Sequence, residues 1–446
     1  MITDTPLLLC ILLSILVIVI LSGKYKVHPF LALIVASIFL GLISGLELNT
    51  ILSSITTGFG NLMAYIGIIV VMGSIIGVYL EKSGGAMTIA QKIIDLAGQS
   101  RSVSAMSLMG AVVSIPVFCD SGFILLSGLS KKLSSLSQAT RASLSLALAT
   151  GLYTTHTLIP PTPGPIATAG NIGAADHLGT IIILGVIISI PVLLLSQYMS
   201  GKLGSKIEIE TVEEEGSDVK TIETDTLPSI WKSLLPVILP ILLISIGTTF
   251  KFLDLNYTWL EFICSPMIAI SIGVGMAMVL IPPPIKKDHQ KWLKEAISVA
   301  GPILIITGAG GAFGGVLKAT DLSAVVGNWI GDNPQSDIAM LCLIFLVAAI
   351  LKSAQGSSTN AMIITSSLLA PLITPMGWND PIDLGLAVMA IGGGAMMVSH
   401  FNDSYFWVVT EFSGLEPDQS FRSFTIITAV QGLTVLGIVI ILSLFV

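Results

Sequence analysis

Apolar runs of about twenty residues recur along the whole chain, the first at 6–22 and the last at 424–446. A run of that length can cross the hydrocarbon core of a bilayer as a helix. Only 11% of the 446 residues are charged, against roughly a quarter in soluble domains, and the mean hydropathy is +0.92. We therefore predict an all-α polytopic membrane protein with about ten full spans embedded in a lipid bilayer.

Basic residues in the polar connections indicate which ends of the spans face the cytoplasm. Lys24 and Lys26 follow the first run, Lys82 and Arg101 flank a later connection, and several lysines lie within 286–294. Cytoplasmic loops carry an excess of Lys and Arg, so these connections are expected inside and the N-terminus outside. The first run has no positive n-region and no small-residue cleavage site, so we expect a retained helix and not a signal peptide.

One hydrophilic stretch, at 201–227, interrupts the apolar pattern and is rich in acidic side chains. Its apolar content is too low for a packed core, so we expect a cytoplasmic linker between two halves. The expected regions are N-terminal scaffold helices (1–58), a first repeat in the transport core (59–200), the acidic linker (201–227), second-half scaffold helices (228–296), and a second repeat with the last helix (297–446).

The two halves share three features in the same order. These are a small-residue stretch with a polar exit (72–84 and 310–321), an apolar segment interrupted by polar and small residues (118–122 and 352–360), and a helix ending in Thr-His or Ser-His (155–156 and 399–400). The charge pattern indicates that the stretch ending at Lys82 runs toward the cytoplasm and that the one ending at Lys318 runs toward the outside. Inverted repeats with broken hydrophobic segments are typical of secondary transporters, which bind their solute where the breaks meet.

Each interrupted segment is expected to form a re-entrant hairpin, one at 103–133 and the other at 337–373. Non-helical backbone at membrane depth is tolerated only where protein buries it or where it lines a wet cavity. Half-helix N-termini at the hairpin tips would present free N–H groups to the carboxylate of a small organic anion. The residues predicted to bind the substrate are Ser121, Gly122, His156, Thr157, Gly164, Ser357, Ser358, Thr359, Asn360, His400, Asn402 and Ser404.

Asp120 and Asp403 lie in otherwise apolar stretches, one in each half. A low dielectric favours the protonated form of an acid, so both are predicted to take part in proton coupling, with His156 as a third candidate. The alternative for each acid is a structural role, as a helix cap or a hydrogen-bonded anchor. Lys352 is expected either to contact an anion or to extend its charge to the membrane interface, and we favour the second.

Several other classes of protein are disfavoured. The histidines and acids lack the close spacing of a zinc site, so we expect no metal and no cofactor. No Walker A sequence is present, which argues against ATP-driven pumping, and nothing suggests a nucleic-acid partner. A channel would need a continuous polar pore lining, for which the charged positions are too few.

The segment 160–165, with the sequence PPTPGP, follows Thr155-His156, and the segment 399–407 has the sequence SHFNDSYFW. In these motifs, and over nearly its whole length, the chain resembles the gluconate permease (gluconate/proton symporter) family. The resemblance implies a bacterial inner-membrane symporter for sugar acids such as gluconate, with D-serine and related hydroxy acids used by relatives. It also implies membership of the ion-transporter superfamily, whose members are typically homodimers that move a transport domain past a fixed scaffold.

The chain departs from that family at two places. Thr162 stands where its gluconate carriers commonly have a His, and Asp120-Ser121 stands where they have a Glu followed by a hydrophobic residue. Asp120 keeps the carboxylate with a shorter reach, and Ser121 adds a hydroxyl. These departures affect the identity of the substrate more than the role of the carboxylate in proton coupling. We expect a substrate shorter or more polar than gluconate.

We therefore predict proton-coupled symport of a small hydroxylated monocarboxylate, gluconate or a related sugar acid, by an elevator-type alternating-access mechanism. Protonation lowers the cost of carrying an anionic site through the membrane, which gives the coupling a physical reason. One alternative is a sodium-coupled or D-serine/D-glycerate-type carrier of the same fold. A distant alternative is an intramembrane aspartyl protease with Asp120 and Asp403 as its dyad, but neither acid follows a Gly-x-Gly motif, so we do not predict an enzyme.

Overall fold

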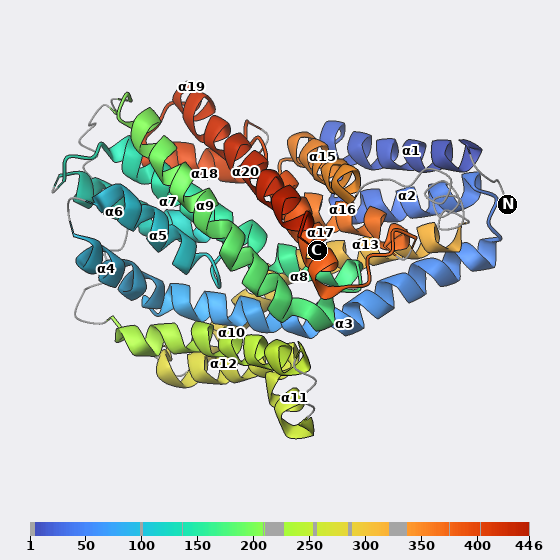
Figure 1. Ribbon diagram of the computed structural model, residues 1–446, viewed down its shortest axis with the longest axis horizontal. Coiled ribbons are helices and arrows are strands. Elements are labelled where there is room, and N and C mark those ends of the chain that lie inside the picture. The colour runs from blue at the N-terminus through green and yellow to red at the C-terminus, as the bar shows by residue number, and fades with distance from the viewer. Residues whose placement is uncertain are drawn as a thin grey trace.

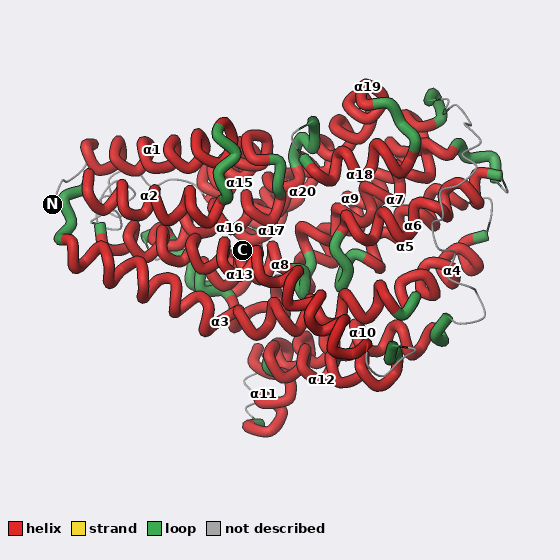
Figure 2. The backbone as a smooth tube through the Cα atoms, turned by 180° about the vertical axis from the view of Figure 1, so that it is seen from behind, coloured by secondary structure: helices red, strands yellow, loops and turns green. Residues whose placement is uncertain are grey.

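The computed structural model is a bundle of helices of very different lengths (Figure 1). It describes residues 5–98, 101–135, 137–207, 209, 227–252, 257–283, 288–320, 337–373, 375–401 and 403–445. Within these ranges every regular element is a helix, and Figure 2 shows no strand among them. The prediction of an all-α protein is confirmed.

The described elements follow one another in two comparable series. The first half forms α1 (Thr5–Val19), the π-helical turn η1 (Ile20–Lys24), α2 (Pro29–Ile43), α3 (Leu48–Lys82), α4 (Gly85–Ala97), α5 (Ser102–Val113), α6 (Cys119–Ser134), α7 (Arg141–Leu158), α8 (Pro163–Asn171), η3 (Ala175–His177) and α9 (Leu178–Gly204). The second half forms α10 (Ile230–Phe252), α11 (Thr258–Cys264), α12 (Pro266–Leu280), α13 (Asp288–Ala319), α15 (Asp337–Gln355), α16 (Ser358–Leu369), η5 (Ala370–Leu372), α17 (Pro381–Met396), α18 (Ser404–Ser413), α19 (Pro417–Ser420), η6 (Phe421–Thr425) and α20 (Ile426–Ser443).

Several of these helices are long and apolar enough to cross a membrane. Among the described residues, five single runs qualify, in α9, α10, α13, α15 and the run that ends in α20. Two bent pairs raise the number to seven, because α3 bends by 45° near its middle and α11 meets α12 at 58°. The helices are therefore those of a multi-pass membrane protein, while the figure of about ten spans stays a prediction.

Both interrupted segments fold as helix, break, helix. The first consists of α5 and α6 with a break at 114–118, and the second consists of α15 and α16 with a break at 356–357. At a rise of about 1.5 Å per residue, the 12 residues of α5 and the 16 of α6 are each too short for a core about 30 Å thick. The 19 residues of α15 come close to that thickness, so the two segments differ in length although they were expected to be alike.

The long helices α3 and α13, which carry the corresponding small-residue stretches of the two halves, pack against each other in opposite directions (Figure 1). Near the start of α3, Gly58 lies against Gly311 near the end of α13. At the other end, Lys82 Nζ forms an ion pair with Glu295 Oε1 at 2.8 Å. Glycine allows this approach because a Cβ at Gly58 would meet the carbonyl oxygen of Gly311.

The innermost helices are α7 and α17. Every residue of α7 from Ala142 to Leu158 is buried, and so is every residue of α17 from Leu384 to Met396. α7 packs against α5, α6 and α9, and α17 packs in the same way against α15, α16 and α20. The short helix after each one crosses to the other half, because α8 packs against α16 and α18 packs against α6. The two halves therefore interlock around two central helices.

The remaining helices lie outside this centre. α12 packs against α3 with α10 beside it, and α2 packs against α13 with α1 beside it (Figure 1). Three boundaries expected from the sequence fall inside helices, namely those after residue 58 in α3, after residue 200 in α9 and after residue 296 in α13. Most of the expected linker, at 208 and 210–226, lies outside the described residues.

The glycine contact between α3 and α13 predicts a difference between two substitutions on α3. Gly58→Ala should lower the free energy of unfolding by about 1–3 kcal/mol, since the new methyl group meets backbone that cannot yield. Gly60→Ala is the control, because nothing lies within 4 Å of a Cβ at Gly60, and alanine is the better helix former. Melting temperatures of the detergent-purified variants measure both effects. Equal melting temperatures would show that the contact does not hold these helices together.

Candidate functional site

A fully buried ion pair joins the end of α15 to the start of α18. Lys352 Nζ lies 2.7 Å from Asp403 Oδ2, and the two side chains are 0% and 4% exposed. The expectation that Lys352 extends to the membrane interface is therefore wrong. The carboxylate keeps the ammonium inside, because a buried charge is tolerated only when it is paired.

Asp403 holds this position through several hydrogen bonds. It is the N-cap of α18, where its Oδ1 accepts from the Tyr405 N–H at 3.1 Å, and its Oδ2 also accepts a short hydrogen bond from the Ser399 hydroxyl. Ser399 is fixed in turn by η6 and α20, since its N–H donates to Thr428 Oγ1 of α20 at 3.1 Å and its carbonyl accepts from Thr425 Oγ1 of η6 at 2.5 Å. Asp403 thus has both structural roles considered for it, a helix cap and an anchor.

Asp120 has a different environment. It lies half-buried in the first turn of α6, and its side chain contacts the Cys119 thiol at 3.6 Å. Among the described residues it forms no ion pair. It nevertheless lies within electrostatic range of Asp403 and Lys352. The structure therefore groups one acid from each half with one buried lysine, and we call Asp120, Lys352 and Asp403 the charge cluster.

The two histidines predicted at the site, His156 and His400, lie at or just after the ends of the central helices α7 and α17. His156 is 4% exposed in the last turn of α7, its ring 6.0 Å from that of Phe118, and its Nδ1 has no hydrogen-bond partner in the described part of the chain. The void beside it measures about 10 Å³, enough for a water molecule and not for a sugar acid. His400 follows α17, and its Nε2 lies 3.2 Å from the Ser353 carbonyl oxygen.

The N-termini of α8 and α16 lie against each other. A Cβ at Gly164, in the first turn of α8, would be 3.9 Å from the Cα of Thr359 in the first turn of α16. Ser357 is the N-cap of α16, where its hydroxyl accepts from the Asn360 N–H at 3.3 Å. Helix N-termini from both halves therefore meet here, and such helix ends favour negative charge.

Two residues near the predicted site were not anticipated from the sequence. Tyr153 of α7 is within hydrogen-bonding reach of the Ser358 side chain, and its hydroxyl donates to the Ala395 carbonyl at 3.3 Å. Glu81 of α3 is within hydrogen-bonding reach of Ser121. Neither was among the residues predicted to bind the substrate, and only the tertiary structure brings them to the site.

Other predicted site residues are less well placed to contact a solute. The Thr157 hydroxyl donates to a carbonyl of its own helix at 3.1 Å, and a Cβ at Gly122 would meet the Leu152 side chain at 2.7 Å. Ser404 is exposed at the first position of α18. Asn402 lies outside the described residues.

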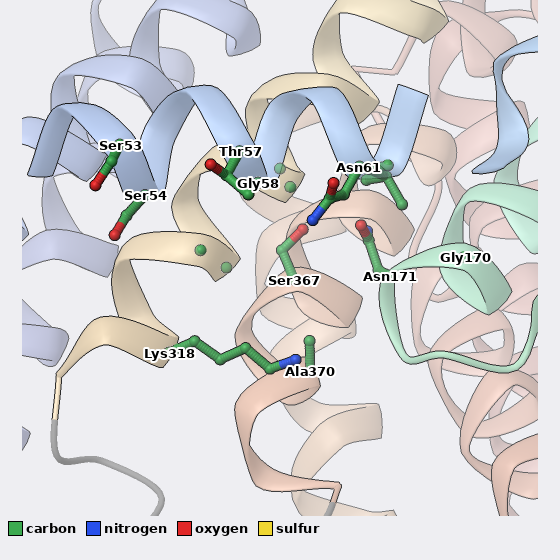
Figure 3. A pocket seen from close by; sticks show the side chains of 15 residues that line it. Ser53, Ser54, Thr57, Gly58, Asn61, Gly170, Asn171, Lys318, Ser367 and Ala370 are labelled. Atoms are coloured by element: carbon green, nitrogen blue, oxygen red, sulfur yellow. The ribbon is translucent and has the colours of Figure 1, made fainter. Parts of the chain in front are cut away.

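A larger polar cavity of about 460 Å³ lies away from the charge cluster, between α3, α13, α8 and the end of α16 (Figure 3). A volume between about 300 and 1,000 Å³ is usual for small-molecule sites. Its lining is made of Ser53, Ser54, Thr57, Gly58, Asn61, Leu62, Gly170, Asn171, Gly310, Gly311, Gly314, Gly315, Lys318, Ser367 and Ala370. None of the residues predicted to bind the substrate is among them.

Broken helices from two halves that meet at buried charges, within a multi-pass helical protein, are the architecture of a membrane transporter. The chain matches the family described as GntP family permease over residues 6–445. It belongs to that family.

Individual relatives agree with this assignment. The chain is 32% identical to a gluconate permease of Pseudomonas aeruginosa, over 99% of this chain and 98% of the relative. It is 30% identical to the D-serine transporter DsdX of Escherichia coli, over 97% of each chain. The YdaH transporter of Alcanivorax borkumensis is similar in fold, with a TM-score of 0.63 at 15% identity over 90% of this chain and 89% of that one.

These comparisons confirm the resemblance seen in the two sequence motifs. The family and these relatives are permeases or transporters, so the protein is a transporter and not an enzyme. The alternative of an intramembrane protease is therefore set aside.

The buried ion pair predicts an unequal effect of single and double substitution. Lys352→Met leaves the Asp403 carboxylate buried without its counter-ion and should cost about 3–5 kcal/mol of stability. Adding Asp403→Asn removes the unpaired charge and should restore most of that loss. Melting temperatures in detergent measure both, with Lys202→Met at an exposed lysine as the control. A double variant no more stable than Lys352→Met alone would contradict the pairing.

Proposed function

We propose that this permease takes up a small hydroxylated monocarboxylate together with a proton across the bacterial inner membrane, by elevator-type alternating access. One observation carries the proposal. The charge cluster contains two carboxylates and one ammonium, so its formal charge is −1 when both acids are ionised. A single proton makes it neutral, and a neutral cluster is cheaper to move through the membrane.

Asp120 is the acid best suited to carry that proton. The Asp403 carboxylate is already engaged by the Lys352 ammonium, the Ser399 hydroxyl and the Tyr405 N–H, so it acts as the fixed partner of the lysine. Among the described residues the Asp120 side chain forms no ion pair and contacts the Cys119 thiol at 3.6 Å, so taking up a proton breaks no ion pair there. In this assignment Asp403 positions Lys352.

The substrate's carboxylate is proposed to bind near Lys352 and the N-termini of α6, α8 and α16. An ammonium has three donors, and among the described residues Asp403 is the one acceptor that Lys352 contacts. We assign the binding of the substrate's hydroxyl groups to Ser121, Ser358, Thr359 and Asn360. Two relatives are named a gluconate permease and a D-serine transporter, and both gluconate and D-serine combine a carboxylate with a hydroxyl.

The membrane arrangement is also part of this proposal. We propose about ten spans, with both interrupted segments as re-entrant hairpins, the N-terminus outside and the linker in the cytoplasm. Regions 59–200 and 297–446 would form the moving core as inverted repeats, and regions 1–58 and 228–296 the scaffold of a homodimer. The antiparallel packing of α3 and α13 supports the inverted relation.

Uptake into proteoliposomes tests the function. Labelled gluconate, D-glycerate and D-serine are offered with a pH gradient imposed in either direction. An inward proton gradient should drive accumulation of one of them, and a protonophore should abolish it. Accumulation that requires a sodium gradient and resists the protonophore would contradict proton coupling and favour the sodium-coupled carrier.

Asp120→Asn should separate coupling from binding. The amide keeps the shape of the side chain but cannot take up a proton. Accumulation under an inward proton gradient should therefore fall to the level measured without a gradient. Exchange of internal for external substrate needs no net proton movement and should persist. Asp95→Asn, at an exposed carboxylate on α4, is the control. Full proton-driven accumulation in Asp120→Asn would show that another group carries the proton.

A further inference from the structure

The polar cavity of about 460 Å³ has no role in the proposed binding of substrate at the charge cluster. In Figure 3, Asn61 of α3 points across it toward Ser367 of α16 and Asn171 of α8, and Lys318 of α13 reaches toward Ala370. Lys318 is the one charged side chain in the described lining. Hydroxyl, amide and ammonium groups therefore face this space from four different elements.

The lining selects the kind of molecule that fits. Ser53, Asn171 and Ser367 already form hydrogen bonds within the protein. An acyl chain would offer no hydrogen-bond partner to the other polar side chains, Ser54, Thr57 and Asn61, which is unfavourable. A small anion with hydroxyl groups instead matches both the polar side chains and the single positive charge. Glycine lets α13 pack closely against α16 beside this space, since a Cβ at Gly310 would come within 2.6 Å of Ser367 Oγ.

The cavity is connected to the proposed substrate site by two helices. α16 has Thr359 in its first turn, where it contacts α8, and Ser367 eight residues further on at the cavity. Eight residues of helix correspond to about 12 Å. α8 likewise begins at the N-terminal contact with Gly164 and ends at the cavity with Asn171. Both sites thus lie on α8 and α16, at opposite ends.

We propose that this cavity is a second binding site for small hydroxylated monocarboxylates, a vestibule that holds the anion before it reaches the charge cluster. The inference rests on the proposed function for the identity of the anion. Lys318 supplies the attraction, and movement of α8 and α16 relative to α3 and α13 opens the way between the sites. By the charge pattern of the sequence, the start of α3 and the end of α13 face outward, so the vestibule serves uptake.

Thiol labelling of the purified full-length protein tests the vestibule. Thr57→Cys places a thiol in the lining, and Leu52→Cys places one on the same helix at a position that is 61% exposed and outside the lining. The probes are an anionic and a cationic methanethiosulfonate, and the unsubstituted protein corrects for its four native cysteines. At position 57 the anionic reagent should react about three- to tenfold faster than the cationic one, because Lys318 is near.

Two further comparisons complete the test. Lys318→Gln should lower the ratio of the anionic to the cationic labelling rate at position 57 to the value of that ratio at position 52. Millimolar gluconate or D-glycerate should slow labelling at position 57 and leave position 52 unchanged. Equal rates for the two reagents, a ratio that Lys318→Gln does not alter, or a lack of protection by both anions would each overturn the proposal.

The labelling assay separates this inference from the proposed function. It uses no gradient and no transport, so its outcome does not depend on which ion drives uptake. Normal labelling and protection in a protein that shows no proton-driven accumulation would contradict only the coupling. Proton-driven accumulation without protection at position 57 would contradict only the vestibule.

Discussion

The hydrocarbon core of a bilayer offers no partners for hydrogen bonds, and this constraint explains why the broken helices lie at the centre of the protein. α7 ends at Leu158 and α17 at Met396, and each is followed by backbone that is not α-helical. Such backbone is tolerated in a membrane protein only when other protein encloses it or it lines a wet cavity. The enclosure is reciprocal, because the short helix after each break packs against the interrupted segment of the other half.

The same constraint governs the polar side chains of the central helices. The Thr150 and Thr154 hydroxyls donate to carbonyls of their own helix, at 2.8 Å each, and the Tyr405 hydroxyl donates to the Ala149 carbonyl at 2.8 Å. The buried charges of Lys352 and Asp403 are partners for each other in their ion pair. Asp120 is the exception among these groups, since it has a weak thiol contact and no ion pair in the described part of the chain. This exception is the reason for proposing Asp120 as the group that carries the proton.

Much of the fold was predictable from the sequence because its signals are local. Long apolar runs predict helices, and polar residues within such a run predict a break in the helix. The expected segments 103–133 and 337–373 accordingly correspond to α5–α6 and α15–α16. Asp120 and Asp403 were recognisable as unusual charges in apolar surroundings. Lys352 was misjudged because a flexible lysine near a helix end looks the same in sequence whether it reaches water or a buried carboxylate. The burial of its partner is a property of the assembled fold.

The cavity and its lining were not predictable for a related reason. Ser53, Asn61 and Ser367 are ordinary residues on apolar helices, and they face one space only because α3, α13 and α16 pack together. The expected boundaries after 58 and 296 fell inside α3 and α13 because both helices continue through those positions. Glu81 and Tyr153 likewise come near predicted site residues only through the packing of α3 and α7 in the assembled fold.

The central claim is that substrate and proton bind together at the charge cluster, and calorimetry of binding tests it most directly. The purified protein is titrated with gluconate, D-glycerate or D-serine above neutral pH, in two buffers of different ionisation enthalpy. Our account predicts heats that differ between the buffers by the uptake of about one proton per bound substrate, with no difference in Asp120→Asn. Measurable binding with the same heat in both buffers would contradict it, because the substrate would then bind without a proton.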